Sequence, residues 1–224
     1  PVYFEKNTSF NAIGNVGGSG QLQPAEGVSD SDASTIKITS TNPSSLQRMV
    51  SGLTVTENSS TAVADGSQTL EELSKTYTVI VLENKYEVKG NEEIPSTVTI
   101  YLNGYTLEIT ANGTLELNGA TVRTGFPAGY SGDSEGGIIS VPVENNVAGT
   151  LILDGADVYA PVDADTDKGA TVVLKNTKSY TISNGTITSP IEVGYGNTVN
   201  AESITVQSGL RIDVYGNFNV AGSL

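Results

Sequence analysis

The stretch Gly113-Thr114-Leu115-Glu116-Leu117-Asn118-Gly119-Ala120-Thr121-Val122 recurs as Gly149 to Val158, with identical residues at seven of the ten positions. In both copies, leucines at alternate positions precede a turn dipeptide, Asn-Gly in the first copy and Asp-Gly in the second. Alternation followed by such a dipeptide is typical of a short β-strand that ends in a tight turn. The repeat therefore predicts that one strand-and-turn unit is used more than once.

Apolar strands also recur at a longer spacing, of about 20 residues. Ile80 and Leu82 are followed by Ile100 and Leu102. The same step leads from Thr150–Leu153 to Thr171–Leu174, and from Ile191–Val193 to Ile212–Val214. A period of this length, made of short strands and turns, predicts a β-solenoid in which each coil stacks on the last.

A meander of β-hairpins is the alternative to this solenoid. Asn103-Gly104 and Asn118-Gly119 both lie between alternating strands, and Asn-Gly is the strongest short-range hairpin signal. In a solenoid the same dipeptides would be corners between one strand and the next.

The composition excludes several classes of protein. The 224 residues include 25 acidic and 11 basic ones, for a net charge of −14, which is opposite in sign to a nucleic-acid-binding surface. Cysteine and histidine are absent, which excludes disulfides, Ser-His-Asp triads and nearly every zinc, copper or haem site. The longest apolar run, Val79–Leu82, is far too short to span a bilayer. We expect an all-β protein with neither a nucleic-acid partner nor a membrane span.

The chain divides by composition near residue 66. Gly14–Gly20 and Gly27–Ser34 are polar and turn-rich, so residues 1–66 predict an extended polar N-terminal arm that serves anchoring and oligomerisation. Residues 67–224 are predicted to form the β-domain. Two short helices are expected: one begins at Asn42-Pro43 and runs to about Val50, and the other, Leu70–Lys75, begins with a Thr69/Glu72 capping box.

A series of segments within residues 67–224 resembles the opening of a known superfamily. These segments are Leu70–Lys75, Thr78–Leu82, Tyr86–Val88, Ile94–Ile100 and Leu102–Leu107. Their order is similar to that in pectate-lyase-like right-handed parallel β-helices: a capping helix, an apolar strand, a Tyr-containing strand, an "x-I-P-x-x-V" step and "L-N-G-x-T-L". The resemblance implies a single-stranded right-handed parallel β-helix of about seven short coils. It implies no particular activity, because such helices serve lyases, hydrolases, adhesins and phage fibres.

No catalytic residues are predicted. A lyase of this superfamily would be expected to have calcium-binding aspartates and a basic proton acceptor. The basic residues of the β-domain C-terminal to Lys89 match no such motif: Arg123, Lys168, Lys175, Lys178 and Arg211. Asp154 and Asp157 could form the carboxylate pair of a glycosidase, but aspartates beside a repeat corner usually serve the turn. We therefore expect a non-enzymatic protein.

Asp163, Asp165 and Asp167 form the one candidate metal site. Three carboxylates at alternate positions before Gly169 suit Ca²⁺, a hard cation that prefers several oxygen ligands from one turn. The alternative is a solvated acidic loop, and no other cofactor is predicted. Four tyrosines near turns are candidate glycan contacts, with ordinary packing as the alternative: Tyr105, Tyr130, Tyr159 and Tyr195.

The leading functional hypothesis is a non-catalytic structural protein of a virion surface, such as a phage capsid or head fibre or a decoration protein. Residues 1–66 would join it to capsid or other assembly subunits, and phage proteins resembling this fold imply a homotrimer. The C-terminal strand Asn217–Val220 would leave an edge that needs a cover.

Two alternatives stay open. One is a secreted extracellular filament subunit or cell-surface adhesin assembled by strand donation, with Val2–Phe4 or Ile36–Ile38 as donor. The other is a carbohydrate-binding or polysaccharide-degrading β-helix module.

Overall fold

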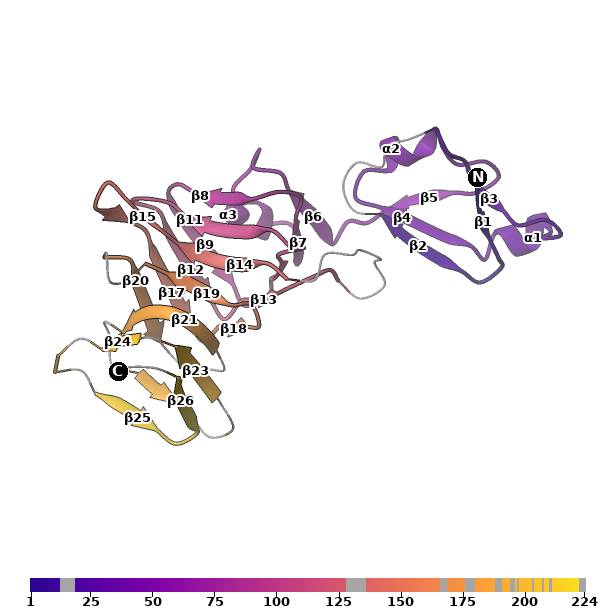
Figure 1. Ribbon diagram of the computed structural model, residues 1–224. Coiled ribbons are helices and arrows are strands. Elements are labelled where there is room, and N and C mark those ends of the chain that lie inside the picture. The colour runs from indigo at the N-terminus through magenta and orange to yellow at the C-terminus, as the bar shows by residue number, and fades with distance from the viewer. Residues whose placement is uncertain are drawn as a thin grey trace. The chain divides into compact units, whose positions relative to one another are not determined.

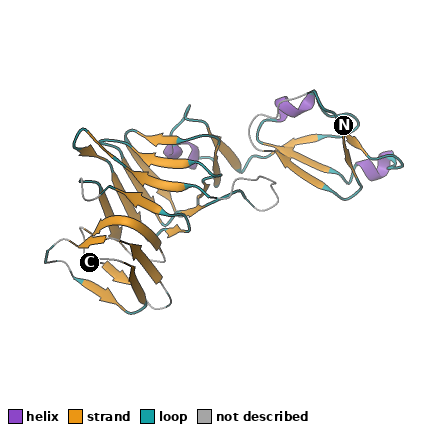
Figure 2. Cartoon of the chain, viewed as in Figure 1, coloured by secondary structure: helices purple, strands orange, loops and turns teal. Residues whose placement is uncertain are grey.

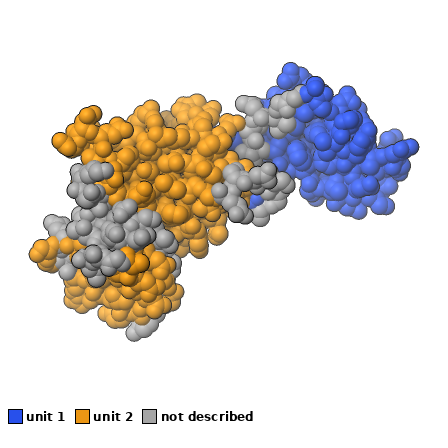
Figure 3. All heavy atoms as spheres, in the orientation of Figure 1, with its two compact units in different colours: residues 1–63, 127–131 blue, residues 64–126, 132–224 orange. Residues whose placement is uncertain are grey.

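The computed structural model is mostly β-strand with few, short helices, which confirms the predicted all-β class (Figures 1 and 2). It describes residues 1–12, 19–127, 136–165, 169–175, 180–187, 191–193, 196, 198–202, 204–206, 208–209 and 211–221. The chain divides into two compact units (Figure 3). Unit 1 comprises residues 1–63 and 127–131, and unit 2 comprises residues 64–126 and 132–224.

Unit 1 is built from short parallel strands and two short helices. Its elements are β1 (Val2–Phe4), β2 (Ser9–Ala12), β3 (Leu22–Pro24), α1 (Asp30–Ala33), β4 (Lys37–Ser40), α2 (Pro43–Gln47) and β5 (Val55–Glu57). β1 pairs with β3, and β4 lies between β2 and β5, all in parallel. A core forms among Phe4, Ala12, Leu22, Ile36, Ile38 and Leu46.

The expectation of an extended polar arm is therefore wrong for the described part of unit 1. Its apolar residues are sparse along the chain, but parallel pairing gathers them: Phe10 lies beside Ile38, and Ile38 beside Val55. The rings of Phe4 and Phe10 meet edge to face, with their centroids 5.6 Å apart. The helix predicted to run from Pro43 to about Val50 begins as expected but ends at Gln47.

Unit 2 carries the remaining elements. They are β6 (Thr61–Ala64, across the boundary), α3 (Leu70–Ser74), β7 (Val79–Leu82), β8 (Tyr86–Val88), β9 (Asn91–Pro95), β10 (Thr99–Tyr101), β11 (Thr106–Ile109), β12 (Thr114–Asn118), β13 (Thr121–Arg123), β14 (Ile138–Val141), β15 (Val143–Glu144), β16 (Val147–Ala148), β17 (Thr150–Asp154), β18 (Asp157–Val158), β19 (Val162–Ala164), β20 (Thr171–Lys175), β21 (Tyr180–Ile187), β22 (Ile191–Val193), β23 (Thr198–Glu202), β24 (Ile204–Val206), β25 (Ile212–Val214) and β26 (Asn217–Ala221).

The chain of unit 2 visits three rows of strands in a repeated order. β7, β8 and β9 are followed by β10, β11 and β12, and each strand of the second set pairs in parallel with its counterpart in the first. The next sets, β13-β14-β17 and β18-β19-β20, pair in the same way. We call one such set a pass. The long strand β21 then pairs with both β19 and β20 and joins two of the rows.

Sequence repeats become spatial neighbours in this arrangement. Leu115 and Leu117 of the first repeat lie beside Leu151 and Leu153 of the second, and Ile80 lies beside Ile100. These side chains point inward and are fully buried. The hairpin alternative is wrong at Asn103-Gly104 and Asn118-Gly119, since the strands around both turns pair in parallel with other passes. Between two described strands, antiparallel pairing is confined to β15 and β16, and an isolated antiparallel bridge also joins Pro95 of β9 to Gly119.

The first residue of each repeat is a glycine because neighbouring passes approach closely there. A Cβ placed on Gly149 would lie 2.6 Å from the carbonyl oxygen of Thr110, and one on Gly113 would lie 2.3 Å from that of Val88. Both distances are below any normal contact, and both obstacles are backbone atoms that cannot swing away. Glycine at these positions thus permits the stacking of one pass on the next.

Replacing Gly149 with alanine should lower the free energy of unfolding by about 1–3 kcal/mol, because the new methyl group overpacks a rigid site. For a chain of this length the melting temperature should fall by roughly 2–4 °C per kcal/mol, measurable by circular dichroism. Gly90→Ala is the matched control, since its Cβ would meet nothing within 4 Å. Equal melting temperatures for the two variants would contradict the close-stacking explanation.

Candidate functional site

The helix α3 begins with the predicted capping box. The Thr69 hydroxyl accepts the Glu72 backbone N–H at 3.0 Å, and the Glu72 carboxylate accepts the Thr69 N–H at 2.9 Å. Leu70 and Leu73 face inward and are buried, and α3 packs against β7 and β9. The prediction of a short helix with a Thr69/Glu72 capping box is confirmed, and the hydrophobic face of this helix covers the apolar interior beside the first pass.

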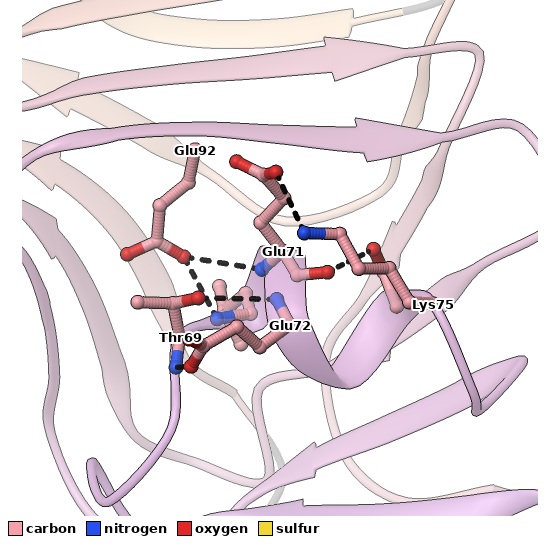
Figure 4. A network of polar contacts seen from close by, with 7 residues as sticks. Thr69, Glu71, Glu72, Lys75 and Glu92 are labelled. Atoms are coloured by element: carbon pink, nitrogen blue, oxygen red, sulfur yellow. Dashed lines mark hydrogen bonds and ion pairs between the residues drawn. The ribbon is translucent and has the colours of Figure 1, made fainter.

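A second carboxylate, Glu92 of β9, binds the same helix end from inside (Figure 4). Its Oε2 accepts the backbone N–H of Leu70 at 2.8 Å and that of Glu71 at 3.4 Å. The Tyr86 hydroxyl accepts the Leu70 N–H at 3.0 Å and lies 3.3 Å from Glu92 Oε1. Free N–H groups at a helix start need acceptors, and these two buried side chains supply them.

The position of Glu92 in the stack explains why it is buried. In the parallel register Glu92 lies beside Leu115, which in turn lies beside Leu151. It thus occupies an inward position that leucine fills in the next two passes, and only the polar end of α3 makes a carboxylate suitable there. Sequence reasoning missed both Glu92 and Tyr86. The available signal was that Glu92 is in phase with Ile94, an inward residue of the same strand.

Burial shifts the pKa values of both groups upward. Desolvation is the main cause of the raised pKa of Glu92, and the nearby Glu71 carboxylate adds to it, while the N–H groups of Leu70 and Glu71 oppose it. Desolvation also raises the pKa of Tyr86, and the negative charge of Glu92 contributes. Such shifts can mark acid–base catalysts, but here Oε2 of Glu92 already accepts two backbone N–H groups and Oε1 lies 3.3 Å from the Tyr86 hydroxyl.

A pocket of about 390 Å³ opens beside this network. Its lining includes Asp65, Glu72, Lys85, Glu87 and Lys89. Lys85 bridges Glu87 and Glu108 at 3.3 and 2.8 Å, and Lys89 lies 3.0 Å from Glu87. The lysine charges are thus already compensated by carboxylates, so an anionic ligand would have to displace them.

The predicted calcium ligands are described only in part. Asp163 is exposed on β19, Asp165 follows that strand half-buried, and Asp167 lies outside the described residues. Asp165 Oδ2 is 3.5 Å from the backbone nitrogen of Val143, at the limit of a hydrogen bond. In the described part of the chain no three acidic side chains are grouped closely enough to hold a metal ion. The calcium site stays a prediction.

Of the remaining basic residues and tyrosines singled out in the sequence, some lie on the surface of unit 2 and others are not described. Arg123 stacks over the ring of Tyr159 at 4.5 Å, and Tyr105 and Tyr159 are exposed. Tyr130, Tyr195, Lys168 and Lys178 lie outside the described residues. Arg211 is paired with Asp213 at 2.8 Å.

The two aspartates of the glycosidase alternative lie in different strands. Asp154 ends β17, beside Asn118 of the preceding pass, and Asp157 begins β18, beside Thr121. Both have electrostatic or hydrogen-bonding partners. This arrangement fits the turn role that the sequence favoured, and the glycan alternative stays a prediction.

Comparison of the chain with models of known protein families, with curated proteins and with solved structures found no match. No helix in the described ranges has the length and apolar character needed to cross a membrane.

Glu92 should make the stability of unit 2 depend on pH. Its pKa is raised by folding, so its stabilising contribution is complete below the ordinary glutamate pKa of 4.5 and is lost as the pH rises through the raised value. The unfolding free energy of the wild type, relative to Glu92→Gln, should therefore fall between acidic and neutral pH. Chemical denaturation at a series of pH values measures this difference.

Glu93→Gln serves as the control, since Glu93 is the exposed neighbour of Glu92 on the same strand. A pH-independent difference between the wild type and Glu92→Gln would contradict the assignment of Glu92 as a desolvated carboxylate.

If Asp163, Asp165 and Asp167 bind calcium, excess Ca²⁺ should raise the melting temperature and a chelator should lower it. A free ion concentration of a hundred times Kd corresponds to about 2.7 kcal/mol. Asp163→Asn should remove the response, whereas Asp30→Asn in unit 1 should leave it intact. Identical melting curves with calcium and with chelator would contradict the calcium site and favour the solvated-loop alternative.

Proposed function

We propose that residues 67–224 wind as a right-handed parallel β-helix, and that the protein is a non-catalytic structural component of a virion surface. A phage capsid or head fibre, or a decoration protein, is the form that the sequence resemblance implies. The observation that carries the proposal is the in-register stacking of inward apolar residues through successive passes, from Ile94 of β9 through β12 and β17 to Leu174 of β20. Such stacking yields a rigid body that can be lengthened by adding passes.

Hydrogen bonds and apolar packing both run from pass to pass along the strand rows. Each pass adds one inter-strand spacing, so about seven passes would give a rod of roughly 35 Å. Inward side chains such as Leu107, Leu117 and Leu153 are fully buried. The surplus of acidic residues, most of them on the exterior, would keep an exposed rod soluble and prevent non-specific association.

The polar groups that are most deeply placed serve the architecture. Buried Glu92 and Tyr86 hold the start of α3. On the exposed surface, Lys85 ties Glu87 of one pass to Glu108 of the next. These contacts support a structural role for the conspicuous titratable groups of unit 2. In the proposal, unit 1 is a small folded anchor that joins the rod to capsid or other assembly subunits, with a homotrimer as the expected oligomer.

A secreted filament subunit or adhesin is the second candidate, and one observation favours it. Among the described strands β1 pairs only with β3, and its Val2 and Tyr3 are exposed, as a donor strand requires. The other predicted donor, Ile36–Ile38, does not fit, because Ile38 is fully buried and β4 is paired on both sides. Strand donation through Val2–Phe4 is the form that remains.

Immunogold electron microscopy of cultures from the source of the gene distinguishes these functions. Antibodies against the purified chain should label virion capsids or their fibres if the leading proposal holds. Label on cell-surface filaments would instead establish the second candidate. Label restricted to the cell interior, with virions and cell surfaces bare, would overturn both.

A further inference from the structure

The two ends of the strand rows in unit 2 are closed differently. At the first pass, α3 packs on β7 and β9, and β6 pairs beside β7. At the other end, β24, β25 and β26 each pair on one side only within the described residues, with β21, β22 and β23 respectively. We call the unpaired sides of these three strands the open end.

Apolar columns reach the open end, where no described strand pairs over them. Val214 lies beside Val193 in parallel register, yet Val193 is fully buried and Val214 is 46% exposed. Phe218 and Val220 continue the columns of Val199 and Ala201, which are buried, but are themselves only half-buried. Apolar residues in inward register without an overlying neighbour indicate a surface that is covered in the working protein.

Unit 1 also has strands with an unpaired side. In the described part of the chain, β1 pairs only with β3 and β2 only with β4. Val2 and Tyr3 on β1 are 53% and 57% exposed, and Phe10 on β2 is half-buried. We call the unpaired sides of β1 and β2 the N-terminal edge. It begins a set of parallel strands, whereas the open end terminates one.

Charge disfavours contact between copies through the middle of the chain and leaves the segments that carry these two surfaces nearly neutral. Residues 1–63 contain five acidic and three basic residues, and residues 180–224 contain three acidic and one basic. Each segment thus carries only −2, while residues 64–179, with 17 acidic and seven basic residues, carry −10. Two copies would repel each other along the middle of the chain and approach with little repulsion at these segments.

We propose that the N-terminal edge of a second copy of this chain docks on the open end and continues its parallel strand rows. One contact then covers both uncovered apolar surfaces, whereas a two-fold contact between open ends would leave Val2 and Tyr3 exposed. This inference rests on the proposed structural role and specifies how the assembly is held together. Head-to-tail contacts close into a ring, such as a trimer, when the rotation between copies allows, and otherwise extend as a filament.

Three valine variants of the full chain test this contact. Val2→Asp disables the N-terminal edge, and Val214→Asp disables the open end. Val147→Asp alters a comparably exposed valine on β16, a strand that belongs to neither surface. Sedimentation velocity over a concentration series should show assembly of the wild type and of Val147→Asp. Val2→Asp and Val214→Asp should each need at least about tenfold higher concentration, since a buried carboxylate costs more than 1.4 kcal/mol.

Mixing the two disabled variants gives the sharpest outcome. Each keeps one working surface, so a head-to-tail contact predicts one-to-one dimers that grow no further. A mixture that stays monomeric, assembly of Val2→Asp at wild-type concentrations, or a monomeric wild type would each overturn the proposal. Circular dichroism verifies that each variant is folded. If an aspartate variant unfolds, the threonine variant at the same position, Val2→Thr or Val214→Thr, takes its place. A negative sedimentation result would contradict the head-to-tail contact but not the proposed location on virions, which the immunogold experiment tests separately.

Discussion

The constraint on which unit 2 depends is that each pass buries its inward apolar residues only when a neighbouring pass places residues beside them in register. Leu115 is buried because Leu151 lies beside it in the next pass, and Leu151 is buried because Val172 lies beside it. Parallel strands fix the spacing, so the chain must also leave room where passes nearly touch, as at Gly113 and Gly149. Apolar columns and close-approach glycines are two consequences of one stacking distance.

This constraint also determines what could be predicted from the sequence. The strand-and-turn repeat and the step of about 20 residues follow directly from stacking. The step predicts that Ile80 and Ile100 are neighbours, and the repeat predicts the same for Leu115 and Leu151. Unit 1 offered no such period. Its parallel partners are separated by 20 residues between β1 and β3, by 28 between β2 and β4 and by 17 between β4 and β5. Unequal loops hide the pairing, and a segment that folds then resembles a polar arm.

The site around α3 was predictable only on its outer side. The Thr69 capping box is local, since its partners lie three residues apart, and the sequence displays it. The contact from Glu92 to the Leu70 N–H joins residues 22 positions apart, and it exists only because β9 passes beneath the helix. A glutamate on a strand is ordinarily read as solvent-facing. Recognising Glu92 as inward would have required aligning it with Leu115 before the register was known.

Both ends of the strand rows in unit 2 have a terminal pass with one side that no further pass covers, but only the end beside α3 is covered by the chain itself. A stack of parallel strands has a direction, and both its terminal passes have one unsatisfied side. At the first pass, α3 meets this need with Leu70 and Leu73, and Glu92 and Tyr86 satisfy the helix start. At the other end, Val214 and Phe218 lie over Val193 and Val199, and no described strand lies over them in turn. Because the two ends differ in chemistry, a cover made of like strands must itself be directional. Continuation by a first strand such as β1 preserves that direction, whereas a two-fold contact would reverse it.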